Sequence, residues 1–199
     1  MQTMVYRSPT EEIAALVQEA CTRETNCFGY GIWTHHITQV VRWGRLLARL
    51  CNADEEVVVL AALLHDYAAV KDEALYAEHH IYGPLEAERL LEQFGYPPEK
   101  IEAVKHCIAT HRASVKAERQ SIEAQCLADA DAMAHIEQVP SLMRMVYVER
   151  GLSIDEGTRW VRAKLERSWN KLSPLAQEMM RDKYEAVQST LSVAGSDAA

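Results

Sequence analysis

The sequence lacks several features that mark large classes of protein. No run of lysine or arginine forms a basic stripe, and 29 acidic residues outnumber 21 basic ones, a net charge of −8 with neutral histidines. We therefore expect neither a nucleic acid polymer nor an anionic membrane surface as a partner. The longest unbroken apolar run, residues 57–64, is also far shorter than a membrane span.

Cysteine pairs of the metal-binding or redox type are missing as well. The five cysteines lie at scattered spacings without a Cys-x-x-Cys pair, which argues against a disulfide framework and against a thiolate zinc site. Residues 1–12 show no signal-peptide pattern. Together these absences predict a protein of the reducing cytoplasm.

Strand-like alternation is absent too, and a helical period runs through the sequence. Capping boxes at Ser8 and Ser153, an N-cap at Asp54 and a helix stop at Gly95 fix several helix ends. No repeat or linker-like segment divides the chain, so we predict one all-α domain over residues 1–199. We expect helices at 9–22, 34–51, 55–70, 84–94, 98–110, 121–137, 153–169 and 173–193, another closed by Gly151, and loops at 23–34, 71–82 and 112–120.

His65 and Asp66 are the most informative residues, because they lie inside the helix 55–70, which is apolar nearly all round. Burying two ionisable groups there is costly unless they are paired or bind a metal. Adjacent residues do not face each other on a helix, so we expect these two to share a third object at the helix end. A core histidine beside an unrelated carboxylate is the simpler alternative, and it weakens as further ligand-type residues are found.

Other histidines supply such residues. His36 and His111 each continue the apolar stripe of a helix and are expected to point into the bundle. His106 falls on a more polar face. His79 and His80 stand together in a segment too short for periodicity to choose between them.

Two late aspartates complete the candidate set. Asp129 and Asp131 lie about 200° apart on a helix, so only one can easily face a site inside the bundle. Periodicity favours Asp129, which shares a face with Met133. Imidazole and carboxylate donors without thiolates suit divalent ions such as Mn, Fe, Co, Ni or Mg.

In this order, the segments resemble the motifs of the HD superfamily of metal-dependent phosphohydrolases, named for its His-Asp pair. The likeness covers about residues 33–137 and implies an all-α helical bundle of the HD-domain type, with a C-terminal helical extension at about 140–193. Its His-x-x-x-Gly motif selects His79, and its closing Ala-Asp motif selects Asp131, although Asp129 stays open. The resembling segments are 36–40, 47–48, 61–66, 79–83, 108–111 and 130–133.

The resemblance implies a metal site with one or two divalent ions, two being favoured. One ion would be held by His36, His65, Asp66 and Asp131, with His65 and Asp66 at the centre of catalysis. A second would bind through His79 and His111 with Asp66 bridging, and His106 could complete its ligands. Three cations near the motifs could bind substrate phosphate, although solvated surface charge is the simpler role for each: Lys71, Lys105 and Arg112.

The activity implied is hydrolysis of a phosphoester or phosphoanhydride in a small, nucleotide-like substrate by metal-activated water. The alternatives are a di-iron oxygenase built on the same ligand types and a non-catalytic ligand-binding module. Tyr67 follows the His-Asp pair where an Ile-Gly-Lys sequence is common in the superfamily, so the substrate is not specified. Aromatic residues after Pro140 could pack on the bundle or cover a homodimer face.

Overall fold

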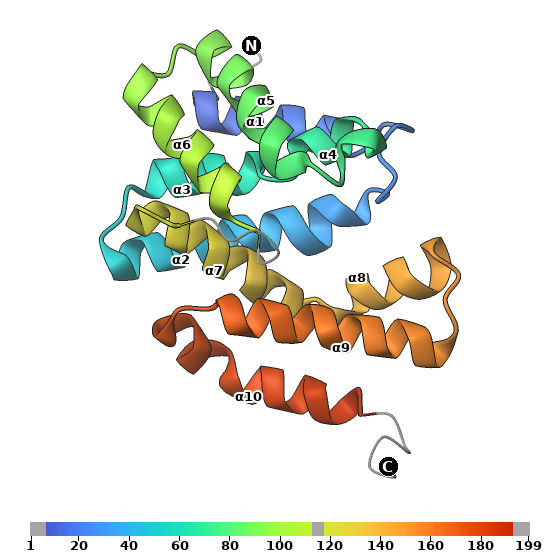
Figure 1. The fold of residues 1–199 in the computed structure, drawn as a ribbon. Helices are drawn as coiled ribbons and strands as arrows, with labels where there is room; N and C mark the ends of the chain where they lie inside the picture. Colours follow the sequence, from blue (N-terminus) through green and yellow to red (C-terminus); the bar gives the residue numbers. More distant parts are fainter. Residues whose placement is uncertain (1–6, 113–117, 193–199) are drawn as a thin grey trace, which may run out of the picture.

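The computed structural model describes residues 7–112 and 118–192, and within these ranges the chain is helical without a strand. Figure 1 shows the helices stacked in an all-α bundle, as predicted. In chain order the elements are α1 (Pro9–Ala20), η1 (Trp33–Ile37), α2 (Thr38–Cys51), α3 (Glu55–Leu64), α4 (Tyr67–Lys71), η2 (Glu73–Leu75), α5 (His79–Gln93), α6 (Pro98–Thr110), α7 (Ile122–Glu137), α8 (Val139–Arg144), η3 (Met145–Glu149), α9 (Ile154–Lys171) and α10 (Pro174–Thr190).

The predicted caps begin the helices that they were expected to begin. Ser8 and Ser153 each form a complete capping box with the glutamate three residues later. The Asp54 carboxylate accepts hydrogen bonds from the backbone amides of Glu56 and Val57 in the first turn of α3. These caps fix α1, α3 and α9 by local chemistry alone.

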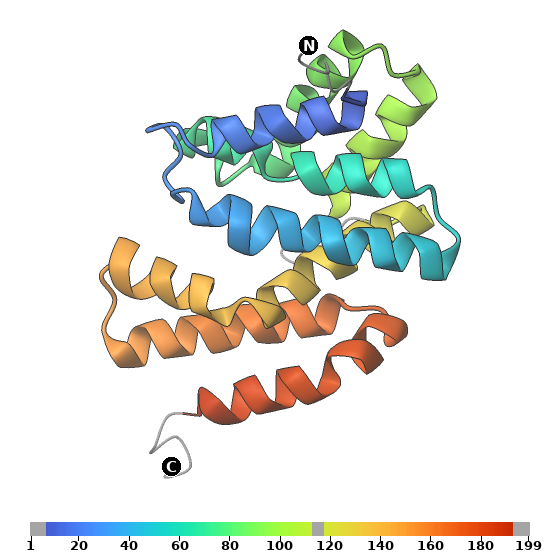
Figure 2. The same cartoon turned by 180° about the vertical axis from the view of Figure 1, so that it is seen from behind.

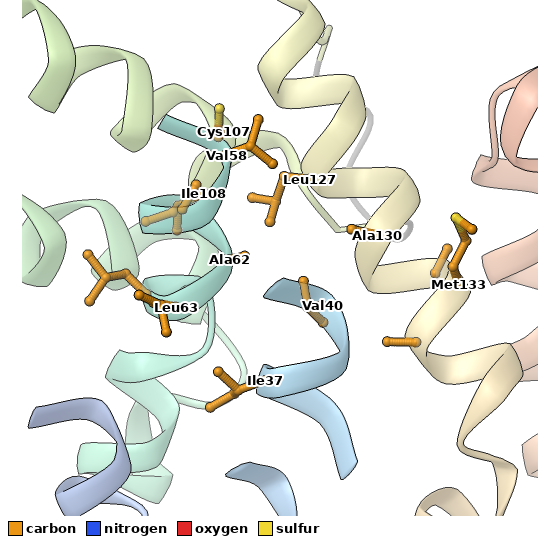
Figure 3. Close-up of a cluster of buried hydrophobic side chains, with 14 of the residues drawn as sticks. Ile37, Val40, Val58, Ala62, Leu63, Cys107, Ile108, Leu127, Ala130 and Met133 are labelled. Carbon is orange, nitrogen blue, oxygen red and sulfur yellow. The ribbon is translucent and has the colours of Figure 1, made fainter. Parts of the chain in front are cut away.

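The core lies where α2, α3, α6 and α7 meet. Gly44 of α2 allows the close approach, because a Cβ there would lie 3.0 Å from Val58 of α3 and 3.7 Å from Ala130 of α7. Figure 3 shows apolar side chains from these helices and from η1 converging, among them Ile37, Val40, Val58, Ala62, Leu63, Cys107, Ile108, Leu127, Ala130 and Met133. Burying such a cluster supplies the main driving force for the fold.

The C-terminal helices α8, α9 and α10 each contact α7 of this core, and α9 also contacts both α8 and α10. Figure 2 shows α9 and α10 lying side by side beneath α2 and α7. One cluster of buried apolar residues runs from Ile13 to Leu191. Within the described residues, no helix is long and apolar enough to cross a membrane.

Two predicted boundaries were wrong. The helix expected over residues 55–70 breaks after Leu64 and resumes at Tyr67. The helix expected from Pro84 begins five residues earlier, at His79, and Pro84 lies inside its second turn. The loop expected at 112–120 includes residues 113–117, which lie outside the described residues.

Candidate metal centre

Six histidine and aspartate side chains from separate elements converge at the end of α3. They form two groups, in each of which one ligand atom per residue lies within 4.8 Å of the others. The first group is His36, His65 and Asp131, and the second is Asp66, His79 and His111. Five of the six are buried, and Asp66 is nearly so.

The break between α3 and α4 brings His65 and Asp66 together. The Asp66 backbone leaves the helical region, with φ −106° and ψ 2°, and its Oδ2 then lies 3.2 Å from His65 Nε2. The expectation that these neighbours cannot face each other holds only for a continuous helix, so it was wrong here.

Asp66 joins the two groups through its two carboxylate oxygens. Its Oδ2 lies 3.3 Å from His36 Nε2, and its Oδ1 lies 3.3 Å from His79 Nε2. The carboxylate therefore has one oxygen on each group, which is the geometry of a bridging ligand.

Three of the histidines are oriented by the same hydrogen bond. Nδ1 of His65, His79 and His111 each lies 2.6–2.8 Å from the carbonyl oxygen three residues earlier. Because a carbonyl only accepts, each Nδ1 donates, which leaves Nε2 to face the cluster. Nε2 of His79 and Nε2 of His111 are 3.3 Å apart.

Asp131 is held from the far side by Lys171 and His135, neither of which is among the predicted site residues. Lys171 Nζ on α9 lies 2.6 Å from Asp131 Oδ2 and 3.0 Å from the His111 carbonyl. His135, four residues on along α7, places Nε2 3.2 Å from Asp131 Oδ1 and stacks on His36. Its spacing from Asp131 was a usable signal, whereas nothing local in the sequence marks Lys171.

The electrostatics of the cluster favour a cation. Burial alone would raise the pKa of Asp66, but the surrounding imidazoles hold it well below its usual value. Burial also opposes ionisation of Asp131, and Lys171 and His135 keep its pKa low. Burial would lower the pKa of His65, yet Asp66 and Asp131 raise it to about 9. The carboxylates of Asp66 and Asp131 thus draw in a proton, and a divalent ion can replace that proton.

The donor set also fits such an ion. Imidazole nitrogens and carboxylate oxygens suit divalent Mn, Fe, Co, Ni or Mg, and no cysteine is among the grouped residues. The described histidine and aspartate cluster could therefore hold a metal.

A cavity of about 440 Å³ opens onto the cluster. His36, Asp66, His79, His111 and Asp131 line one part of it. Apolar residues from two sides line the rest, together with basic residues of the C-terminal helices. The apolar ones include Phe28, Ile32, Leu142, Met145 and Trp160, and the basic ones are Arg144, Lys164 and Arg167.

The structure does not bring Asp129 or His106 to the cluster. Asp129 accepts hydrogen bonds from the Ser173 amide and hydroxyl at the start of α10, at 2.9 and 2.6 Å. His106 Nε2 accepts a hydrogen bond from the Gln120 backbone amide at 3.1 Å. Periodicity could not choose between the two aspartates, because α7 is buried on almost every side and no face of it is specially marked.

Of the three cations predicted to bind phosphate, only Arg112 lines the cavity. Lys71 instead pairs with Glu86 at 2.6 Å. Lys105 pairs with Glu88 and also with Glu102. Both lysine side chains therefore point to acidic partners, on the neighbouring helix turn or on α5, and away from the cavity lining.

Fold and site together define a class: an all-helical protein with a bridged histidine and carboxylate cluster that could hold divalent metal. Residues 33–136 match the model of the HD domain family. Because that match covers more than half of the chain, this protein belongs to the HD domain family. The predicted resemblance is thereby confirmed.

Solved structures share the fold. A predicted HD superfamily hydrolase from an uncultured Thermotogales bacterium is 22% identical, with a TM-score of 0.62 over 91% of this chain and 88% of that one. Bacillus subtilis YpgQ is 23% identical, with a TM-score of 0.68 over 92% and 91% of the two chains. The structure of YpgQ in complex with ADP is 22% identical, with a TM-score of 0.67 over 92% of this chain and 93% of that one. No curated protein sequence matches this chain.

Proposed function

We propose that this protein is a metal-dependent phosphohydrolase acting on a phosphoester or phosphoanhydride of a small, nucleotide-like substrate. One observation carries the proposal: two ligand groups share the Asp66 carboxylate and open onto a cavity that also holds cationic side chains. Ligand sites combine apolar walls with a few placed polar groups in this way.

The proposed ligands follow the two groups. His36, His65, Asp66 and Asp131 would hold one ion, and Asp66, His79 and His111 would hold a second. Divalent ions held there would lower the pKa of a bound water and polarise a phosphoryl oxygen.

The remaining chemistry belongs to the chain itself. Lys171 fixes the orientation of Asp131, and the carbonyl hydrogen bonds fix His65, His79 and His111. Preorganised groups of this kind need little rearrangement as charge develops during reaction. The apolar wall limits water around the substrate, which strengthens each charge interaction inside.

A nucleotide-like substrate is supported by the complex of YpgQ with ADP. The cavity supports it independently, since aromatic and cationic side chains line it together. A cytoplasmic location is also proposed, because all five cysteines are described and all are free thiols. The homodimer stays a prediction.

The test combines metal analysis with hydrolysis. We expect the purified protein to contain one or two equivalents of Mn, Fe, Co or Ni, or to take up Mg, and to hydrolyse p-nitrophenyl phosphate or nucleotides. Asp66→Ala should lose at least a hundredfold in activity. Asp182→Ala, which removes an exposed aspartate of α10, is the matched control and should behave as wild type.

Other outcomes would overturn the proposal. A protein that stays inert and metal-free after supplementation with each ion would be a binding module. Two tightly held irons with oxygen consumption and no phosphatase activity would identify an oxygenase.

A further inference from the structure

Lys164 on α9 is a cation in the wall of the cavity. It forms no hydrogen bond or ion pair with any residue in the ranges 7–112 and 118–192. Burial lowers the pKa of its ammonium, while Asp131 and Asp66 lie near enough to raise it. A half-buried charge with no direct partner in the protein is stabilised when a ligand supplies the opposite charge.

Other basic side chains lie near Lys164 on the same side of the cavity. Arg167, three residues along the same helix, is an exposed cation that also lines the cavity and forms no ion pair within the described chain. Arg144 is paired with Glu149 at 3.3 Å, and Arg112 donates to the Ala77 carbonyl at 2.6 Å. In a protein of net charge −8, basic side chains gathered along one cavity wall favour an anionic ligand.

An aromatic side chain lies one turn before the lysine. Trp160 lines the same cavity, together with Leu142 and Met145. Its indole is half-buried and packs against the core, so its position is fixed. This part of the cavity suits a flat or apolar group.

These residues follow one face of a continuous helix. Trp160, Lys164 and Lys171 are spaced four and seven residues apart within α9, which places them on one side of it. Along the axis, Lys164 stands about 6 Å from Trp160, and Lys171 about 10 Å further on. Since Lys171 contacts Asp131, the face presents an aromatic ring, then a free cation, then the metal centre.

We propose that this face of α9 selects and orients the substrate, with Lys164 binding a phosphoryl group and Trp160 binding an aromatic group on the side away from the metal centre. The inference rests on the proposed function and deepens it. It assigns the residues that recognise the phosphoryl and the aromatic parts of that substrate. It also places the recognition residues outside the segment that matches the family.

Two non-hydrolysable probes separate the two contacts. Methylphosphonate offers the anionic group alone, and phenylphosphonate adds an aromatic ring. Binding would be measured by calorimetry on the metal-loaded, full-length protein. We expect wild type to bind phenylphosphonate at least about tenfold more tightly than methylphosphonate.

Lys164→Met should weaken both probes by about tenfold or more, because a charge-assisted contact is lost. Trp160→Leu should weaken phenylphosphonate alone and bring it close to methylphosphonate. Lys183→Met removes a half-exposed lysine of α10 and should bind both probes as wild type does. Metal content should be unchanged in all three variants.

Lys164→Gln keeps the test decisive if the methionine variant does not fold. Unchanged binding of both probes to the folded Lys164 variant would overturn the inference, and so would a Trp160→Leu variant that keeps the preference for phenylphosphonate. If wild type hydrolyses phosphate esters in either case, the proposed function stands alone. If metal-loaded wild type binds neither probe and hydrolyses nothing, the proposed function has failed.

Discussion

Asp129 and Asp131 are both buried on α7, yet they contact different parts of the molecule. Asp129 caps α10 through Ser173, whereas Asp131 faces His36 and Lys171. We expect Asp129→Asn to lower the free energy of unfolding by about 1–3 kcal/mol while keeping the metal. Asp131→Asn should lower metal affinity at least about tenfold. Urea unfolding and metal analysis of the two variants check this, and the reverse pattern would make Asp129 the ligand.

Lys171 offers a second test at the scale of one residue. Its side chain is only 4% exposed and pairs with Asp131. Lys171→Met leaves a buried carboxylate without its cation, which should destabilise the metal-free protein by about 3–5 kcal/mol. Added divalent metal should restore part of that loss, because it supplies the missing charge.

Thermal melts with and without metal would measure the effect. The gain in Tm from metal should be larger in Lys171→Met than in wild type or in Lys183→Met. An equal gain in all three proteins would contradict the idea that Lys171 and the ion compensate the same carboxylate.

The clustered residues could be predicted because their order along the chain matches a family pattern. His36, His65, Asp66, His79 and His111 all meet in the structure as that pattern implied. The supporting residues could not be predicted in the same way, because a lysine on a polar helix face looks the same whether it meets solvent or a buried carboxylate. Only tertiary packing distinguishes Lys164 and Lys171 from surface lysines.

At the scale of elements, the sequence predicted helix starts better than helix breaks. Starts at Ser8, Asp54 and Ser153 have local capping chemistry. The break after Leu64 has no glycine or proline to mark it, and the apolar pattern continues across it. Instead, the His65 ring donates a hydrogen bond to the Ala62 carbonyl at the end of α3. A periodicity argument does not detect such a bond.

Gly83 allows α5 to pack closely against α6 and against the break between α3 and α4. A Cβ at Gly83 would lie 2.9 Å from Ile108 Cγ2 and 3.5 Å from the His65 carbonyl. Because Ile108 is β-branched and buried, Gly83→Ala should cost about 1–3 kcal/mol of stability. The shift of α5 should also weaken the second metal site, since His79 lies on that helix.

Denaturant unfolding and metal stoichiometry would measure both effects. Gly31→Ala is the control, because a Cβ there meets nothing nearer than 3.8 Å. A Gly83→Ala variant as stable as that control would show that α5 can move without penalty.

At the scale of the whole molecule, the ligand groups connect η1, α5 and α7 with the ends of α3 and α6. An ion bound to all of these stabilises the folded state over the unfolded one. We expect removal of metal by a chelator to lower Tm, and a hundredfold excess of ion over its Kd to be worth about 2.7 kcal/mol. Calorimetric scans measure this, and a Tm indifferent to metal would contradict the proposed ligands.

The placement of the C-terminal helices could not be predicted from the sequence. The family likeness ended near residue 137, and helical periodicity says which face of α9 is apolar but not which helix covers it. The packing of α9 on α7 is a long-range contact, and it alone brings Lys171 to Asp131.

The spread of the ligands from His36 to Asp131 has a consequence for folding kinetics. Among the six, only His65 and Asp66 are neighbours in the chain, so an unfolded chain offers an ion little more than a pair of donors. The ion can be captured only after the long-range packing has formed. Metal should therefore leave the folding rate nearly unchanged and slow unfolding instead, which would make it a determinant of the protein's lifetime rather than of its path to the native state.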